Sequence, residues 1–129
     1  MIVVDTSVWI AARRDARILR ALDSLIDTDN VALALPVRLE LWAGVATHER
    51  KAFARAFGAL LQLVPTEETW APLPGWIQQA AKGGERFGLT DLLIASLATG
   101  IGGLVWSLDA DFVRMEHLKL VSRYDPPLA

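Results

Sequence analysis

The stretch Ile2-Val3-Val4-Asp5-Thr6-Ser7 joins three apolar, β-branched residues to three polar ones. A short run of this composition predicts a buried β-strand over residues 2–4. Asp, Thr and Ser are favoured at the position before a helix, so a helix is expected to begin near Val8. The chain therefore opens with a buried strand whose carboxyl end carries a carboxylate, Asp5.

The rest of the chain repeats this alternation of strands and helices. Further strands are expected at residues 31–35, 63–64, 104–108 and 118–121. Helices are expected at residues 16–27, 36–44, 48–61, 91–99 and 110–117, with one more that begins at or after Pro74 and ends near residue 81. Thr90 is expected to cap the helix that carries Asp91. This order predicts an α/β fold with a short, mainly parallel sheet flanked by helices, in a single domain spanning residues 1–129.

The composition limits the chemistry that the chain can perform. There is no cysteine, which excludes disulfides and thiolate metal sites, and there are only two histidines, which disfavours a histidine-rich zinc site. A metal site in this chain must use oxygen ligands, which suit Mg²⁺ or Mn²⁺. The net charge of −2 gives no general attraction to nucleic acid.

The chain is also apolar for its length, with 53% hydrophobic residues and a mean hydropathy of +0.32. We therefore expect a partner or a second copy to cover part of the surface. Trp42, Trp70 and Trp76 fit a dimer or partner groove and fit core packing equally well. No signal peptide is recognised, and glycines interrupt the longest uncharged run, residues 92–108, so no membrane association and a cytoplasmic location are expected.

Acidic residues follow the predicted strands. In an open parallel sheet, ligands bind beyond the carboxyl ends of the strands. Asp5 and Asp109 come directly after two of these strands, and Glu40 lies about one turn into the helix that follows another. Asp91 opens the apolar helix, but topology alone does not place it at the same edge.

Carboxylates gathered at one edge repel one another, and a divalent cation relieves that repulsion. Such an ion also supplies water molecules and stabilises charge on a phosphate. An acidic cleft is thus compatible with a polyanionic substrate. Taken singly, Asp5, Asp91 and Asp109 are equally well explained as residues at helix starts, and Glu40 as an exposed helix residue. The set and its order carry the functional interpretation.

Four segments resemble the acidic motifs of PIN domains, in particular those of VapC-type toxin ribonucleases. They are Ile2-Val3-Val4-Asp5-Thr6-Ser7, Pro36-Val37-Arg38-Leu39-Glu40-Leu41-Trp42-Ala43-Gly44, Gly88-Leu89-Thr90-Asp91-Leu92-Leu93-Ile94-Ala95-Ser96 and Trp106-Ser107-Leu108-Asp109-Ala110-Asp111-Phe112. The third is the most specific, and together they cover nearly the whole chain at the family's spacing.

The resemblance implies a three-layer PIN-like fold and a Mg²⁺- or Mn²⁺-dependent endoribonuclease, the toxin of a toxin–antitoxin pair. It also implies a homodimer and inhibition by a small cognate antitoxin protein. The catalytic residues that carry over are Asp5, Glu40, Asp91 and Asp109, and the metal ligands are Asp5, Asp91, Asp109 and Asp111. Members of the family use either acid of the pair Asp109 and Asp111, or both. Thr6, Thr90 and Ser107 are expected to orient carboxylates or water by hydrogen bonds.

On this interpretation a water molecule, with Glu40 holding it or acting as base, attacks an RNA phosphodiester and leaves a 5′-phosphate and a 3′-hydroxyl. Arg13 and Arg86 lie near acidic motifs and are candidates for a rim that binds the RNA backbone, although charged runs more often form solvated helix faces.

Two other functions compete with the nuclease. A haloacid-dehalogenase-like phosphoryl-transfer site needs a second Asp two residues after the first, and that position is Ser7. A non-catalytic PIN-like module that binds RNA or protein is the stronger alternative, but all four acidic motifs are occupied.

Overall fold

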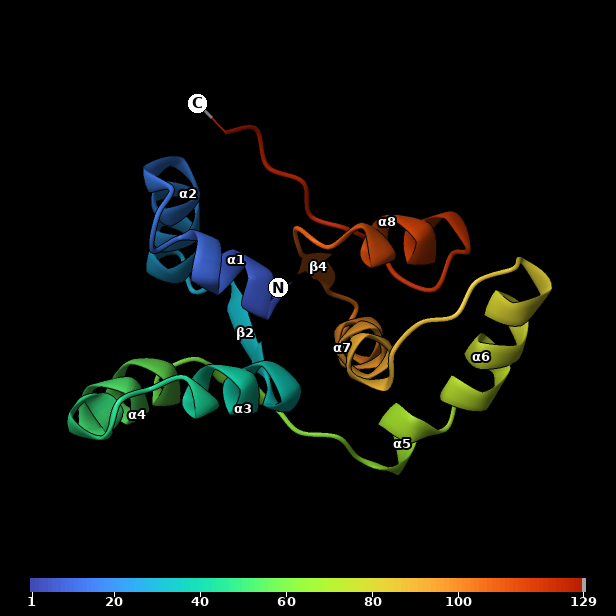
Figure 1. The fold of residues 1–129 in the computed structure, drawn as a ribbon, viewed down its shortest axis with the longest axis horizontal. Helices are drawn as coiled ribbons and strands as arrows, with labels where there is room; N and C mark the ends of the chain where they lie inside the picture. The colour runs from blue at the N-terminus through green and yellow to red at the C-terminus, as the bar shows by residue number, and fades with distance from the viewer. Residues whose placement is uncertain (129) are drawn as a thin grey trace.

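The computed structural model describes residues 1–128, which form a parallel sheet with helices on both sides (Figure 1). The strands are β1 (Ile2–Val4), β2 (Val31–Ala34), β3 (Leu61–Leu63) and β4 (Leu104–Trp106). The helices are α1 (Thr6–Ala11), α2 (Ala16–Asp27), α3 (Leu35–Ala43), the 3₁₀ turn η1 (Thr47–Glu49), α4 (Arg50–Gly58), α5 (Glu67–Trp70), α6 (Leu73–Lys82), α7 (Leu89–Gly100) and α8 (Ala110–His117).

The sheet has the strand order β3-β2-β1-β4, and each neighbouring pair is parallel. Val3 pairs with Ala32 on one side and with Val105 on the other, which puts the opening strand of the chain at the centre of the sheet. All the carboxyl ends of the strands therefore point to one edge. The predicted α/β fold with a parallel sheet is confirmed.

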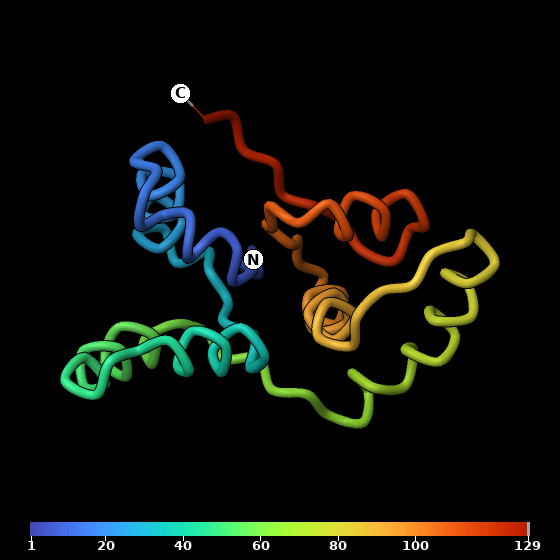
Figure 2. Tube along the Cα trace, viewed as in Figure 1, coloured from blue at the N-terminus to red at the C-terminus, as the bar shows by residue number. Residues whose placement is uncertain are grey.

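The two faces of β1 pack into different parts of the core because successive side chains alternate across the sheet. Val3 lies in a cluster with residues of α7 and α8, including Ile94 and Phe112. Val4 lies in the opposite cluster, with Val8 of α1 and residues of α2. The chain thus forms three layers, and the Cα trace shows α1 and α2 on one side of the strands and α7 on the other (Figure 2).

Several predicted boundaries were wrong by one or more residues. Leu35 belongs to α3 and not to β2, since Pro36 sits in the first turn of the helix, where its missing N–H costs nothing. The predicted helix 48–61 is split into η1 and α4, and the strand after it begins at Leu61 and not at residue 63. Helix α5 was not predicted, because four residues followed by two prolines give no helical period.

The predicted last strand at residues 118–121 is wrong for a clear reason. Lys119 has a φ of 62°, a left-handed conformation that turns the chain out of α8. The chain reaches the sheet only later, where the Val105 N–H donates to the Ser122 carbonyl and the Tyr124 N–H donates to the Val105 carbonyl. Residues 122–124 thereby cover the outer edge of β4, leaving β3 as the open edge.

Among residues 1–128, no helix combines the length and the apolar character that crossing a membrane requires.

Candidate metal centre and active site

Asp5 follows the central strand and has its side chain almost fully buried, with 7% exposed. Its backbone occupies the N-cap position of α1, but its carboxylate makes no capping hydrogen bond. Instead, Oδ2 accepts hydrogen bonds from the hydroxyls of Ser7 and Ser107, each at 2.7 Å. The simple helix-cap explanation for the Asp5 side chain is therefore wrong.

The two hydroxyls are oriented by the backbone. The Leu108 N–H donates to Ser7 Oγ at 3.1 Å, and the Asp109 N–H donates to Ser107 Oγ at 3.0 Å. A serine hydroxyl has a single proton, so each is free to give that proton to Asp5. Oδ1 of Asp5 makes no hydrogen bond within residues 1–128, and no side-chain oxygen there is both fully buried and unpartnered. Oδ1 therefore keeps some accessible surface and an unused acceptor for a ligand.

Asp91, Asp109 and Asp111 form a tight cluster beside this network. Each offers one carboxylate oxygen, and the three oxygens lie within 4.8 Å of one another. Asp91 lies in the first turn of α7, and Asp109 and Asp111 lie at the start of α8. Asp109 also caps α8, because its Oδ1 accepts a hydrogen bond from the Asp111 N–H at 2.9 Å. Asp109 therefore both caps α8 and belongs to the acidic cluster.

The charge on Asp91 is influenced by three of the other predicted acids. Partial burial is the largest cause that raises the pKa of the Asp91 carboxyl to about 6, and the negative charges of three acids add to it: Asp109, Asp5 and Glu40. The chain thus brings Asp91 to the same edge as the other three, which topology alone left open. No hydrogen bond to the Asp91 side chain occurs in the described part of the chain.

Glu40 lies on α3, on the exposed side of the site. Its Oε1 accepts a hydrogen bond from the Thr6 hydroxyl at 3.0 Å, so the first acidic motif positions the second. Ser107 and Thr6 therefore contact acids, as their sequence positions suggested. Ser7 was missed by the sequence reasoning; its place beside Asp5 and its hydroxyl were the available signals.

Within residues 1–128, three of the predicted site residues make no hydrogen bond or ion pair with the acids, although Thr90 lines the same hollow as Glu40. Thr90 is exposed and does not cap α7, whose N-cap residue is Gly88. Arg13 lines a hollow against α4, beside Phe53. Arg86 is exposed in the loop before α7.

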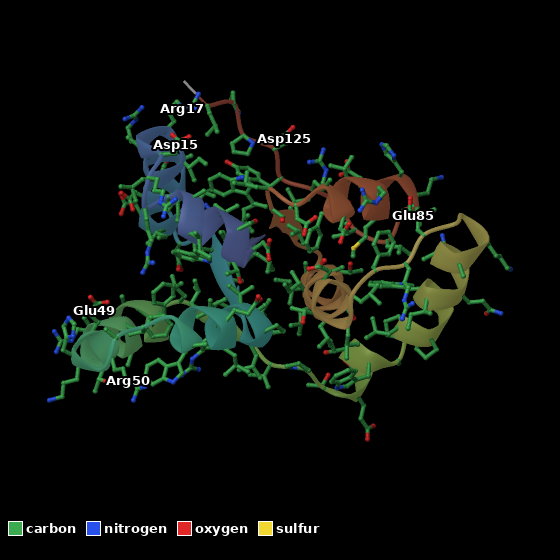
Figure 3. All side chains as sticks on the ribbon, in the orientation of Figure 1. Asp15, Arg17, Glu49, Arg50, Glu85 and Asp125 are labelled. Carbon is green, nitrogen blue, oxygen red and sulfur yellow. The ribbon has the colours of Figure 1, made fainter. Side chains whose placement is uncertain are left out.

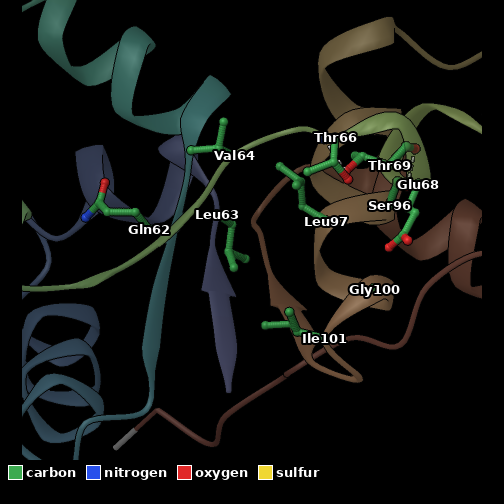
Figure 4. Close-up of a pocket in the computed structure, with 10 residues that line it drawn as sticks. All are labelled: Gln62, Leu63, Val64, Thr66, Glu68, Thr69, Ser96, Leu97, Gly100 and Ile101. Carbon is green, nitrogen blue, oxygen red and sulfur yellow. Dashed lines mark hydrogen bonds between the residues drawn. The ribbon is translucent and has the colours of Figure 1, made fainter.

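A separate hollow of about 270 Å³ lies between β3, α5 and the second half of α7 (Figure 4). Ser96 lies in its wall and donates a hydrogen bond to the Thr69 carbonyl at 2.6 Å. None of the acids Asp5, Glu40, Asp91, Asp109 and Asp111 lines this hollow. It therefore lies apart from the candidate active site.

The residues at the acidic edge fit a hard divalent cation. Every available donor is a carboxylate oxygen, which is the ligand type that Mg²⁺ and Mn²⁺ take. After burial, the negative charges of Asp109, Asp5 and Glu40 also raise the pKa of Asp91. A cation bound beside Asp91 would offset this repulsion.

The family model described as the PIN domain matches residues 2–118, and the chain belongs to this family. PIN domains are generally nucleases. A comparison with curated protein sequences gave no match.

Solved structures share the fold over nearly the whole chain. FitAcB from Neisseria gonorrhoeae is similar at 27% identity with a TM-score of 0.77, covering 98% of both chains. VapBC2 from Rickettsia felis, bound to a DNA fragment from its promoter, has 17% identity and a TM-score of 0.76, covering 96% of this chain and 98% of that one. VapBC-1 from nontypeable Haemophilus influenzae has 20% identity and a TM-score of 0.73, covering 97% and 98%. These neighbours are toxin–antitoxin complexes.

Proposed function

We propose that this chain is a Mg²⁺- or Mn²⁺-dependent endoribonuclease that hydrolyses phosphodiester bonds in RNA. The observation that carries the proposal is the close cluster of Asp91, Asp109 and Asp111 beside Asp5, at the carboxyl ends of the parallel strands. Membership of a family of nucleases supports it.

Asp91, Asp109 and Asp111, together with Oδ1 of Asp5, are the residues that would hold the ion. When bound, the divalent cation offsets the charge of the carboxylates and stabilises negative charge on the scissile phosphate. The cation thus reconciles an acidic site with a polyanionic substrate.

The protein groups have distinct tasks in this proposal. Ser7 and Ser107 fix the orientation of the Asp5 carboxylate. Glu40, exposed and held by Thr6, is placed to accept a proton from the attacking water. Attack by water leaves a 5′-phosphate and a 3′-hydroxyl. Arg13 and Arg86, both exposed, are the proposed contacts to the RNA backbone outside the site.

We also propose that the nuclease is the toxin of a cytoplasmic toxin–antitoxin pair, inhibited by a small antitoxin protein and active as a homodimer. The structural neighbours support an antitoxin partner, since they are complexes of that kind. Exposed apolar side chains offer surface for both partners: Trp42 is 38% exposed, Leu39 56% and Trp70 46%. Trp76 packs against the core instead.

Purified protein incubated with total RNA tests the activity. We expect cleavage with Mg²⁺ or Mn²⁺, products that carry 5′-phosphates, and no cleavage in EDTA. The variant Asp5→Asn should be inactive, and Asp23→Asn, an exposed acid on α2, should cleave like wild type. RNA binding without cleavage in wild type would favour a non-catalytic binding module, and equal cleavage in EDTA would remove the metal from the proposal.

A further inference from the structure

Arg114 joins the acidic cluster to a second acidic residue outside it. Its Nη2 donates to Oδ1 of Asp111, and its Nε lies 3.2 Å from Oε2 of Glu85. One guanidinium thus contacts two carboxylates that come from different segments. Asp111 belongs to the metal cluster and Glu85 does not.

The local structure fixes both ends of this contact. Phe112 and Met115 are fully buried and anchor α8, so that Asp111 and Arg114, also three positions apart, share another side of the helix. Glu85 is held where α6 ends: Gly84, with a φ of 75°, lets the Glu85 N–H donate to the Ala80 carbonyl at 2.8 Å. Figure 3 shows Glu85 in the loop after α6, beside α8.

The contact with Arg114 determines which carboxylate oxygens of the cluster remain available to a cation. Asp109 uses Oδ1 to cap α8, and Asp111 uses Oδ1 for Arg114. Each therefore keeps one oxygen for a cation. The guanidinium is rigid and planar, and a contact of this kind fixes the direction of a carboxylate better than a flexible ammonium group does.

We propose that Arg114 is a positioning residue for the metal centre: with Glu85 it holds Asp111 so that this carboxylate is a ligand beside Asp109. The inference rests on the proposed function. It assigns both acids of the fourth motif, Asp109 and Asp111, as metal ligands. Arg114 contacts neither substrate nor cation itself, and acts through Asp111. Loss of a residue that orients a metal ligand typically weakens metal binding about 10- to 100-fold.

The fold supplies a second link between the same segments. Gln79 of α6 donates a hydrogen bond to the Leu118 carbonyl just after α8, at 2.9 Å. Removing the Arg114 side chain therefore leaves α6 and α8 joined, and the variant is expected to fold.

The test measures binding of Mn²⁺ to the full chain by calorimetry, without RNA. We expect Arg114→Gln to weaken Mn²⁺ binding about 10- to 100-fold. Arg114→Lys keeps the positive charge but loses the planar guanidinium, so it should weaken binding less. The matched control is Arg123→Gln, because Arg123 pairs with Glu116, another carboxylate of α8, at 3.3 Å and outside the cluster. This control should bind Mn²⁺ within about twofold of wild type, the scatter expected where no ligand is touched.

A double-mutant cycle shows whether the effect runs through Asp111. If it does, Arg114→Gln will add little to the loss already caused by Asp111→Asn. Full additivity would overturn the inference, as would wild-type binding in Arg114→Gln or an equal loss in Arg123→Gln. If the wild-type chain binds no Mn²⁺, the proposed function itself fails and takes the inference with it, so the two failures are distinct.

Discussion

Asp5 and Asp91 belong to the same acidic site but are held in opposite ways. Asp5 is the more buried and receives two hydroxyl hydrogen bonds on one oxygen. Asp91 is half-buried and receives none within the described residues, and its pKa is raised to about 6. The protein supplies two donors to one oxygen of Asp5 and none to Asp91. In the proposed metal centre, Asp91 is therefore the carboxylate that depends most on the cation.

Replacing each of these acids by Asn should separate their roles most strongly. Both variants should lose RNA cleavage by about a thousandfold, the effect of several kcal/mol of lost metal stabilisation. Their metal-free stabilities should move in opposite directions at pH 7. Asp91→Asn removes a repelled charge and should stabilise by about 1 kcal/mol after screening by solvent. Asp5→Asn should destabilise by about 1–3 kcal/mol, because two half-buried hydroxyl donors lose their anion.

Urea unfolding in EDTA, followed by fluorescence, measures these stabilities, and Asp23→Asn serves as the control. If both variants shift stability in the same direction, the contrast between the two carboxylates is wrong.

Removing the hydroxyls of Ser7 and Ser107 tests how the Asp5 carboxylate is held. Ser7→Ala and Ser107→Ala should each reduce cleavage about 10- to 100-fold, because the Asp5 carboxylate loses one of its two donors. The double variant should lose less than the product of the two single effects, since both act on the same oxygen. Initial cleavage rates at saturating Mg²⁺ measure this. Ser24→Ala, on α2 and exposed, is the control, and full activity of both site variants would contradict the network.

The smallest effect is the pH dependence of the metal-free protein. The Asp91 carboxyl has the ordinary aspartate pKa of 3.8 in the unfolded chain and a pKa of about 6 in the folded protein. Between these values the folded state retains a proton that the unfolded state has lost, so this carboxyl makes the free energy of unfolding fall as the pH rises from about 4 to about 6. The full loss, about 1 kcal/mol after screening, then persists at higher pH.

The difference between wild type and Asp91→Asn, measured across this range in EDTA, isolates the contribution. Saturating Mg²⁺ should abolish the fall, because the cation replaces the proton. A pH-independent difference would mean that Asp91 titrates normally.

Much of the fold was predictable where the sequence pattern is strong and local. The strand Ile2–Val4 and the helices Ala16–Asp27 and Ala110–His117 have the predicted bounds, because composition or apolar spacing marks them clearly. Helix α5 and the segment after α8 were not predictable, since their conformation depends on prolines and on the left-handed Lys119. Tertiary contacts decide such regions.

The same division applies to the site. Asp5 and Asp109 could be placed at the edge of the sheet because they follow predicted strands. The position of Asp91 depends on the path of the loop before α7, which the sequence pattern does not predict. Ser7 could not be assigned a task from sequence alone, because its partner network includes Ser107 from the far end of the chain. The pairing of Arg114 with Glu85 had no signal either, since Glu85 lies in an irregular segment.

The central position of β1 has a consequence for when activity can arise during synthesis. The first strand emerges from the ribosome first, but it pairs with β4, and Ser107 reaches Asp5 across 102 positions. A nascent chain that ends with β4 lacks Ser107, one of the two donors to Asp5, and two of the three clustered acids, Asp109 and Asp111. The segment that follows β4 must therefore be synthesised before a complete site exists on the growing chain.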